Sequence, residues 1–201
     1  MNHMNQSRLL MLPVLIVMVT TAAQAQRRWE RLPAPRDPQF YVPRNKLEDF
    51  EGRVETLLIR GRHWVGTVRG QGGIAQVEAS EIRDSVTSEA ASGAVITIKA
   101  DGGPAGEIRS LIDYDEIDGL LRAMDAAAKA SESITRLSHF EVRYRTKGDF
   151  EIMVFKQLEN NVVAAAVEGG FFERSRLYLS IEDLVKLRWM IAQAKERLDQ
   201  K

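Results

Sequence analysis

The sequence predicts an α+β fold in which two tandem units of antiparallel β-strands, each followed by one amphipathic helix, pack as one domain. Three observations support this prediction. Runs rich in β-branched and aromatic residues precede each helix-like segment, glycine-containing turns separate the runs, and the order of strands and then a helix occurs twice.

The first predicted unit covers about residues 50–131. Alternation from Val54 to Ile59 predicts a strand, and three further runs predict strands at 63–69, 74–79 and 94–100. Glycine-rich stretches at 70–73 and 101–104 are typical of turns. We interpret most of the polar stretch 80–93 as a surface excursion. From Asp115 to Ala130 apolar residues recur every three or four positions, which predicts a helix.

The second predicted unit covers about residues 138–199. A β-hairpin is expected around the turn at 147–149, because Phe140, Val142 and Tyr144 alternate with charged residues before it. Strands at 162–168 and 174–179 follow. The last helix is expected from Ile181 to about Leu198, with Ser180 as its N-cap and Asp183 at position N3.

The two predicted units also match residue by residue over short stretches. Residues 114–122 match residues 178–186 at a constant offset of 64, and Val95–Gly103 matches Val162–Gly170 at an offset of 67. We infer a tandem duplication in which the first copy has three extra residues in its turn.

The first 25 residues are typical of a cleavable signal peptide. Polar residues and the single cation Arg8 precede an apolar run from Leu9 to Val19, and Ala23-Gln24-Ala25 carries small residues where signal peptidase cleaves. We expect cleavage after Ala25. A retained anchor is the alternative, but eleven residues would span only about half of a hydrocarbon core of about 30 Å.

The next segment, residues 26–45, is predicted to be an extended arm. Four of the six prolines lie in it, and repeated X-Pro pairs hold a chain extended. The body is expected from residue 46 to residue 201. No cysteine is present, so neither a lipid tether nor a disulfide can form, and we expect a soluble periplasmic or secreted protein with no membrane anchor after cleavage. Its formal charge of −1 after loss of Arg8 argues against nucleic acid as a partner.

Two resemblances accompany these patterns. The order of a sheet and then one helix, repeated over roughly residues 50–199, resembles the Whirly family, which binds single-stranded nucleic acid across its strand surfaces, although the lysine-rich signature strand of that family is missing. The strings at 113–119 (DYDEIDG) and 144–150 (YRTKGDF) resemble a group of exported bacterial proteins with no assigned activity. This second resemblance implies export and no mechanism.

The sequence offers few residues for catalysis or for binding a metal. Cysteine and the G-x-S-x-G pattern are missing, and only His63 and His139 remain after cleavage, without the spacing of a metal site. The glycine-rich stretch 66–73 lacks the ending of a phosphate-binding loop. The acidic run from Asp113 to Asp118 departs from an EF-hand loop, so we expect these acids to cap the helix and predict no metal site and no cofactor.

Cations spaced by two residues on predicted strands are the best candidates for ligand binding. If their sheet faces coincide, arginine and aromatic side chains together could hold an anionic polymer or a stacked ring. Alternatively, a charged sheet face simply meets water, and Glu141, Glu151 and Glu173 pair with the arginines. The candidate residues are Arg62, His63, Trp64, Arg143, Tyr144, Arg145, Arg174 and Arg176.

These observations predict an exported, non-enzymatic binding or interaction module for an unknown envelope or extracellular ligand or protein. Two other classes stay open. One is a binder of single-stranded nucleic acid or another polyanion, and the other is a hydrolase that uses two carboxylates.

Overall fold

The computed structural model describes residues 42–101, 107–130, 135–137, 139–157, 161–171 and 173–200. The predicted signal peptide, most of the predicted arm and the turn at 102–104 lie outside these ranges. Among the helices that are described, none combines the length and the apolar character needed to cross a bilayer.

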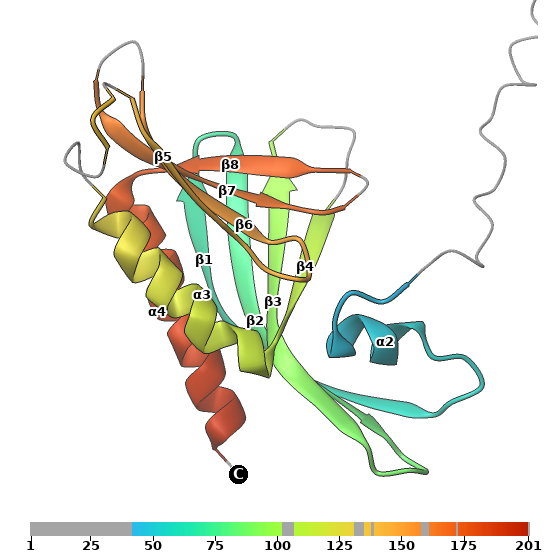
Figure 1. Cartoon of the computed structure of the whole chain (residues 1–201). Coiled ribbons are helices and arrows are strands. Elements are labelled where there is room, and N and C mark those ends of the chain that lie inside the picture. The colour runs from blue at the N-terminus through green and yellow to red at the C-terminus, as the bar shows by residue number, and fades with distance from the viewer. Residues whose placement is uncertain are drawn as a thin grey trace, which may run out of the picture. The chain divides into compact units, whose positions relative to one another are not determined.

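The described chain is an α+β fold of two antiparallel four-stranded sheets, each followed by a helix, which confirms the predicted class (Figure 1). Sheet A contains β1 (Leu58–Gly70), β2 (Gly73–Asp84), β3 (Ala90–Ala100) and β4 (Glu107–Asp113), and α3 (Tyr114–Ala128) follows it. Sheet B contains β5 (Glu141–Arg145), β6 (Glu151–Lys156), β7 (Val163–Gly169) and β8 (Ser175–Leu179), and α4 (Ile181–Asp199) follows it. In both sheets the strands neighbour one another in chain order.

One hydrophobic core joins the two units. One face of each sheet supplies alternate apolar side chains, and the buried faces of α3 and α4 complete the core. The two sheets also contact each other directly, mainly through β3, β7 and β8. At one edge the backbone of Gln71, in the β1–β2 turn, exchanges hydrogen bonds with Tyr178 of β8. Because both units bury residues in the same core, they form one folded body.

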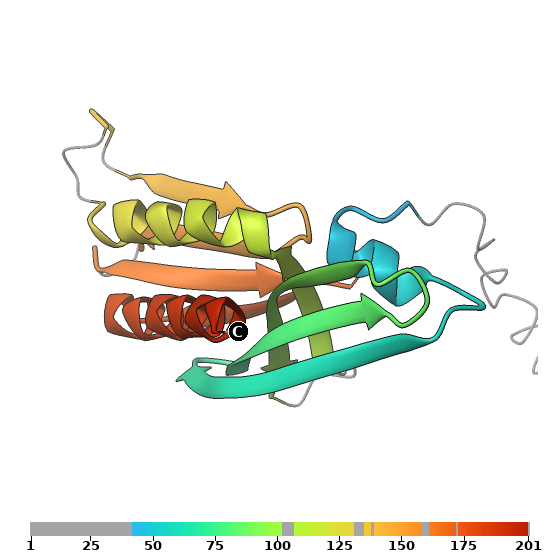
Figure 2. The ribbon, with the colours of Figure 1, turned by 90° about the horizontal axis from the view of Figure 1, so that it is seen from below.

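The helices α3 and α4 lie side by side and run antiparallel (Figures 1 and 2). Their exposed seam carries ion pairs between Asp118 and Lys195, at 2.7 Å, and between Asp125 and Arg188, at 2.9 Å. At the end of the seam the Tyr114 hydroxyl donates to Asp199. Each contact joins the first unit to the second, so the helix pair fastens the two units together.

A short helix, α2 (Lys46–Gly52), covers the opposite face of sheet A. Its residues Leu47 and Phe50 form a second apolar cluster with Ile82, Val95 and Leu111 of the sheet. Sheet A is therefore buried on both faces over part of its area.

The structure corrects several predicted boundaries. Residues 46–52 form a helix although the body was expected to begin with strands, and residues 53–57 precede β1, with Glu55 at a φ of 57°. The stretch 80–93 is not a surface excursion, because β2 continues to Asp84 and β3 begins at Ala90. Strand β4 was not predicted. The hairpin at 147–149 and both long helices are confirmed.

Candidate functional site

The register of sheet B gathers most of the predicted arginines on one face. Glu151 lies opposite Glu168 on the two central strands, and Arg145 and Arg176 flank them on the outer strands. The alternate residues Ile152 and Val167 point into the core, so this row lies on the outer face of the sheet. We call this surface the arginine face, and it comprises Arg143, Arg145, Glu151, Phe155, Glu168, Arg174, Arg176 and Tyr178.

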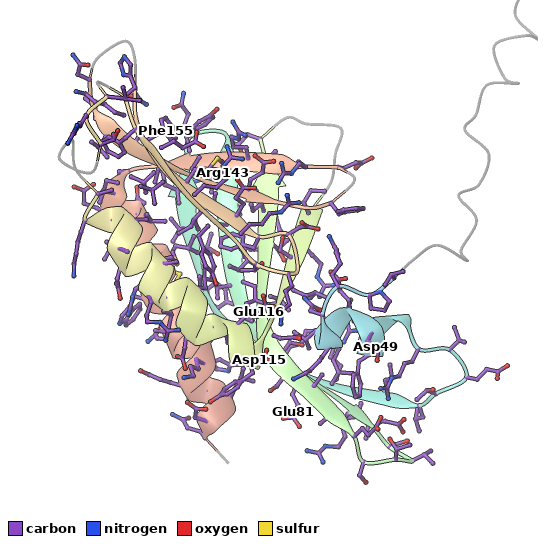
Figure 3. All side chains as sticks on the ribbon, in the orientation of Figure 1. Asp49, Glu81, Asp115, Glu116, Arg143 and Phe155 are labelled. Carbon is purple, nitrogen blue, oxygen red and sulfur yellow. The ribbon has the colours of Figure 1, made fainter. Side chains whose placement is uncertain are left out.

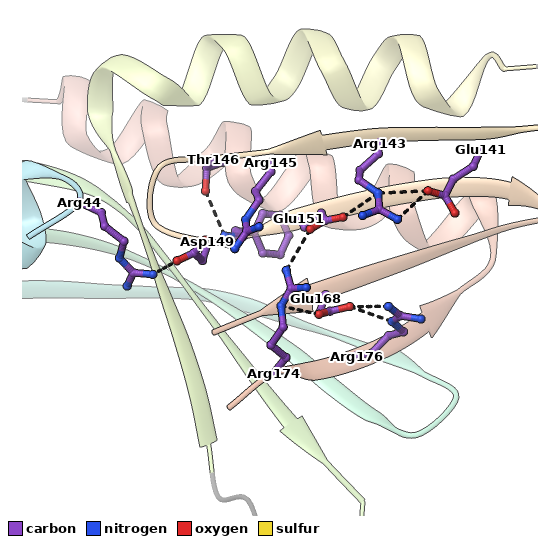
Figure 4. Close-up of polar contacts among 11 residues, drawn as sticks. Arg44, Glu141, Arg143, Arg145, Thr146, Asp149, Glu151, Glu168, Arg174 and Arg176 are labelled. Atoms are coloured by element: carbon purple, nitrogen blue, oxygen red, sulfur yellow. Dashed lines mark hydrogen bonds and ion pairs between the residues drawn. The ribbon is translucent and has the colours of Figure 1, made fainter. Parts of the chain in front are cut away.

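Two buried carboxylates organise the arginine face (Figure 4). The side chains of Glu151 and Glu168 are only 2% and 5% exposed. Arg174 bridges them, with Nη2 at 3.0 Å from Glu151 and Nε at 2.6 Å from Glu168. Arg143 adds a 3.0 Å contact to Glu151, and Arg176 adds a 2.7 Å contact to Glu168. Since a buried carboxylate is costly unless it is paired, these contacts hold the guanidinium groups in place.

The acids also stabilise the charged arginines. The pKa of Arg143 is raised by its hydrogen bond to Glu141 and further by the charge of Glu151. The pKa of Arg176 is raised first by its hydrogen bond to Glu168 and then by a hydrogen bond with Tyr178. Neither arginine therefore loses its charge at any physiological pH.

Two of the three central arginines keep one donor group in reserve. The contacts of Arg143 and Arg174 use their Nε and Nη2 groups, and within the described residues no hydrogen bond uses their Nη1 groups. Arg176 has both Glu168 and Tyr178 as partners. A guanidinium carries five N–H donors, so the half-exposed side chains of Arg143 and Arg174 can still donate to a ligand.

Aromatic side chains adjoin the arginines on the same face. Phe155 and Tyr178 meet edge to face with ring centroids 6.5 Å apart, and Tyr178 is 41% exposed. Figure 3 shows Phe155 and Arg143 on the same sheet. Beside Tyr178 lies a cavity of about 350 Å³, which Ala164, Arg69 and Ser180 also line.

A further ion pair closes one end of the face. Asp149, in the β5–β6 turn, contacts both Arg145 and Arg44. Arg44 lies near the start of α2 and also stacks over the ring of Phe171, 4.9 Å from its centroid. The arginine face is thus connected to the segment before sheet A.

The remaining predicted site residues lie elsewhere. Tyr144 points to the inner face of sheet B, packs against the core and approaches Gly119 of α3. Arg62 and Trp64 share the face of sheet A that carries α2, and alternation puts His63 on the other face of that strand. The structure therefore does not bring the 62–64 group to the arginine face.

The acidic run at the start of α3 disperses instead of forming a site. Asp113 accepts from the backbone of α2, Asp115 pairs with Lys46, Glu116 accepts from the backbone of Lys147, and Asp118 pairs with Lys195. Figure 3 shows Asp115 and Glu116 at the start of α3. Over the described ranges, no group of three His, Asp or Glu side chains is arranged to hold a metal ion.

Sequence reasoning missed Glu168, Phe155 and Tyr178 as members of the arginine face. Tyr178 continues the two-residue spacing of Arg174 and Arg176, so that spacing could have indicated it. Glu168 becomes evident only once the register between β7 and β8 is known. Of the predicted acidic partners, Glu141 and Glu151 pair with arginines, whereas Glu173 forms no ion pair within the described chain.

No family model, curated protein or solved structure shows a significant similarity to this chain. The assignment of a function therefore depends on the geometry of the site.

Proposed function

We propose that this chain is an exported, non-enzymatic binding module whose ligand lies on the arginine face. One observation carries the proposal. Buried Glu151 and Glu168 hold three half-exposed guanidinium groups in fixed positions, and Arg143 and Arg174 each keep an unused Nη1 donor. Donors held in place before binding lose little conformational entropy when a ligand arrives. The proposal that the chain is exported rests on the predicted signal peptide.

The chemistry of the arginine face favours a ligand that combines hydrogen-bond acceptors with a ring or an apolar group. The free Nη1 groups suit carboxylate, sulfate or carbonyl oxygens. The exposed ring of Tyr178, supported by Phe155, provides a surface on which a sugar or an aromatic ring could stack. Envelope glycans and extracellular polypeptides both offer such groups.

A polyanion is the second candidate ligand, and the free Nη1 donors favour it. Its weak point is charge balance, because every arginine of the face contacts at least one carboxylate. A face that is neutralised internally releases few counterions from a polyanion, so binding would vary only slightly with salt.

The opposed carboxylates Glu151 and Glu168 are an arrangement that a hydrolase could use. An acid and base pair needs one carboxyl group that holds a proton. Here Arg174 contacts both side chains, each has a second arginine beside it, and the two carboxylates are buried beneath these guanidinium groups, which a substrate would have to displace. The contacts therefore support binding more than catalysis.

The experiment uses the processed chain, from which the predicted signal peptide has been removed. It measures retention of this chain on peptidoglycan, alginate and single-stranded DNA at low and high salt. We expect saturable binding to peptidoglycan, which offers both sugar and peptide groups, weakened about tenfold or more by Arg143→Gln, whereas binding to alginate and DNA alone would favour the polyanion. Arg143 is a suitable position because Glu151 keeps its contact with Arg174.

The matched control is Arg122→Gln, which removes an exposed arginine from α3 and leaves the arginine face intact. Hydrolysis of a generic ester, glycoside or phosphate by the wild-type chain would contradict the proposal. If Arg122→Gln weakens binding as much as Arg143→Gln does, the ligand does not bind at the arginine face.

A further inference from the structure

We propose that the free edge of β1 binds an extended acidic segment of another polypeptide, which adds to sheet A as a fifth strand. This inference goes beyond the proposed function, because β1 belongs to the other sheet. Strand β1 is 13 residues long and ends the order of sheet A, and Figure 2 shows it as the outermost strand. Edge strands offer unpaired backbone groups to any chain that can pair with them.

From Leu58 to Trp64, the amides and carbonyls of the even-numbered residues of β1 point toward this edge. The amide of Ser85 donates to the carbonyl of Leu57 at 3.0 Å, so before the bulge the odd-numbered residues make the hydrogen bonds to β2. The amides and carbonyls of Arg60, Arg62 and Trp64 therefore face away from β2. Within the described residues these groups have no backbone partner outside the sheet.

The side chains keep the edge open. Residues 59–64 are exposed on both faces of the strand, and Ile59 and Trp64 are each 58% exposed. A free segment of seven residues, from Leu58 to Trp64, is about 23 Å long, which suffices for an ordinary strand. Beyond it, a bulge between Trp64 and Gly66 begins the part of β1 that α4 covers. The bulge thus limits the docking segment.

The charge of β1 identifies the class of partner. Strand β1 contains three arginines and one histidine and no acidic residue. Arg60 is paired with Glu51 at 3.0 Å, whereas Arg62 has no ion pair within the described chain. A segment with an acidic side chain opposite Arg62 would neutralise this cation and satisfy the free backbone groups in one step.

A second copy of this chain fits the edge less well. Two antiparallel copies of β1 centred on Gly61 would place Arg60 of one copy opposite Arg62 of the other. Like charges directly opposite each other destabilise a strand pair. The arginines therefore oppose self-association and favour an acidic partner.

The experiment uses three nine-residue peptides with blocked termini and the processed chain, from which the predicted signal peptide has been removed. One peptide alternates glutamate and valine, the second has lysine in place of glutamate, and the third is the glutamate peptide N-methylated along its length. We expect the first to bind with a Kd below about 1 mM and the other two to bind at least about tenfold more weakly. The amides of Arg60, Arg62 and Trp64 should gain hydrogen-exchange protection in the complex.

Variants separate the edge from the rest of the surface. Arg62→Glu should weaken binding of the glutamate peptide about tenfold or more, and Arg122→Glu, on an exposed helix face, should leave it within about twofold. Equal binding of the N-methylated peptide, or protection that spares these amides, would overturn strand addition. If the wild-type chain self-associates and Arg62→Glu changes this association, the edge binds a second copy of the chain instead. Arg143→Gln tests the arginine face alone, so failure of one proposal is distinguishable from failure of the other.

Discussion

The carboxylate of Asp113 accepts a 3.0 Å hydrogen bond from the backbone amide of Leu47, 66 residues earlier in the chain. Its other oxygen accepts from the amide of Lys46 at 2.8 Å. Asp113 is the N-cap residue of α3, yet its side chain makes no hydrogen bond to that helix. The acid that ends β4 therefore accepts from the first two amides of α2, whose N-cap is Asn45, and holds this helix on sheet A.

Replacing Asp113 should detach α2. Asp113→Ala leaves two backbone amides without an acceptor, and the amide of Leu47 is buried, so we expect a loss of about 1–3 kcal/mol in the free energy of unfolding. Urea denaturation measures this loss. Asp115→Ala is the control, because it removes only an exposed pair with Lys46 and should cost under about 1 kcal/mol. Equal losses in the two variants would contradict this role of Asp113.

Arg174 should contribute strongly to stability. Arg174→Met removes the bridge between Glu151 and Glu168 and leaves each buried carboxylate with fewer partners, so we expect a loss of about 1–3 kcal/mol in unfolding free energy. Adding Glu168→Gln should recover part of this loss, because it removes one buried charge. The control Arg83→Met breaks one exposed pair and should have little effect. A neutral Arg174→Met variant would show that the carboxylates do not need the bridge.

Gly148 should tolerate no side chain. A Cβ atom there would lie 1.8 Å from the carbonyl oxygen of Leu111 and 2.7 Å from the Asn45 amide. Gly148→Ala must push the β5–β6 turn away from β4, so we expect a loss of about 2 kcal/mol or more in thermal or urea unfolding. Gly61→Ala meets nothing within 4 Å and should be neutral or slightly stabilising. Similar behaviour of both variants would be inconsistent with this packing.

Asp84 should make the β2–β3 turn sensitive to acid. Its pKa is lowered from an ordinary value of 3.8, first by the amide of Val86 and then by that of Thr87, which donate at 2.7 and 3.1 Å. Because the pKa is lower in the folded state, the stabilisation is complete above about pH 5 and disappears as the pH falls through the folded pKa.

An NMR titration of the Asp84 carboxyl group tests this turn directly. We expect a midpoint below 3.8 and, between about pH 5 and pH 3, a steeper loss of stability in the wild type than in Asp84→Asn, which cannot titrate. A midpoint at or above 3.8, or identical slopes, would count against the hydrogen bonds as the cause.

Local signals predicted most of the fold. Ser180 accepts from the amide of Asp183 as the sequence indicated, because an N-cap and its target are three residues apart. The turn at 147–149 likewise depends on neighbouring residues. Helix α2 was missed because seven residues are too few to show helical periodicity, although its N-cap Asn45 is a local signal, and Asp113, which also accepts from its first turn, is distant in sequence. Small residues in the stretch 80–93 are typical of a loop. In the structure, small residues of this stretch pack under α2, a helix that the sequence did not predict.

The candidate site was predictable in part. Alternation placed Arg143 with Arg145 and Arg174 with Arg176, and the structure puts all four on one face. That Glu168 and Glu151 face each other follows from the register of β6 with β7, which a single sequence does not reveal. Arg62 shares its spacing with these residues but lies in the other sheet, because periodicity fixes a face within a strand and not the position of a sheet.

The paired helices α3 and α4 have a consequence for the origin of the chain. A single copy of the strand-and-helix unit would expose its inner sheet face and one side of its helix to water, so it could persist only by pairing with a twin. We infer that an ancestor with one unit paired as a homodimer, and that duplication of its single gene followed by fusion joined the two copies. With both copies in one chain, the inner sheet faces and the helices are covered within one molecule, whatever the concentration of the protein.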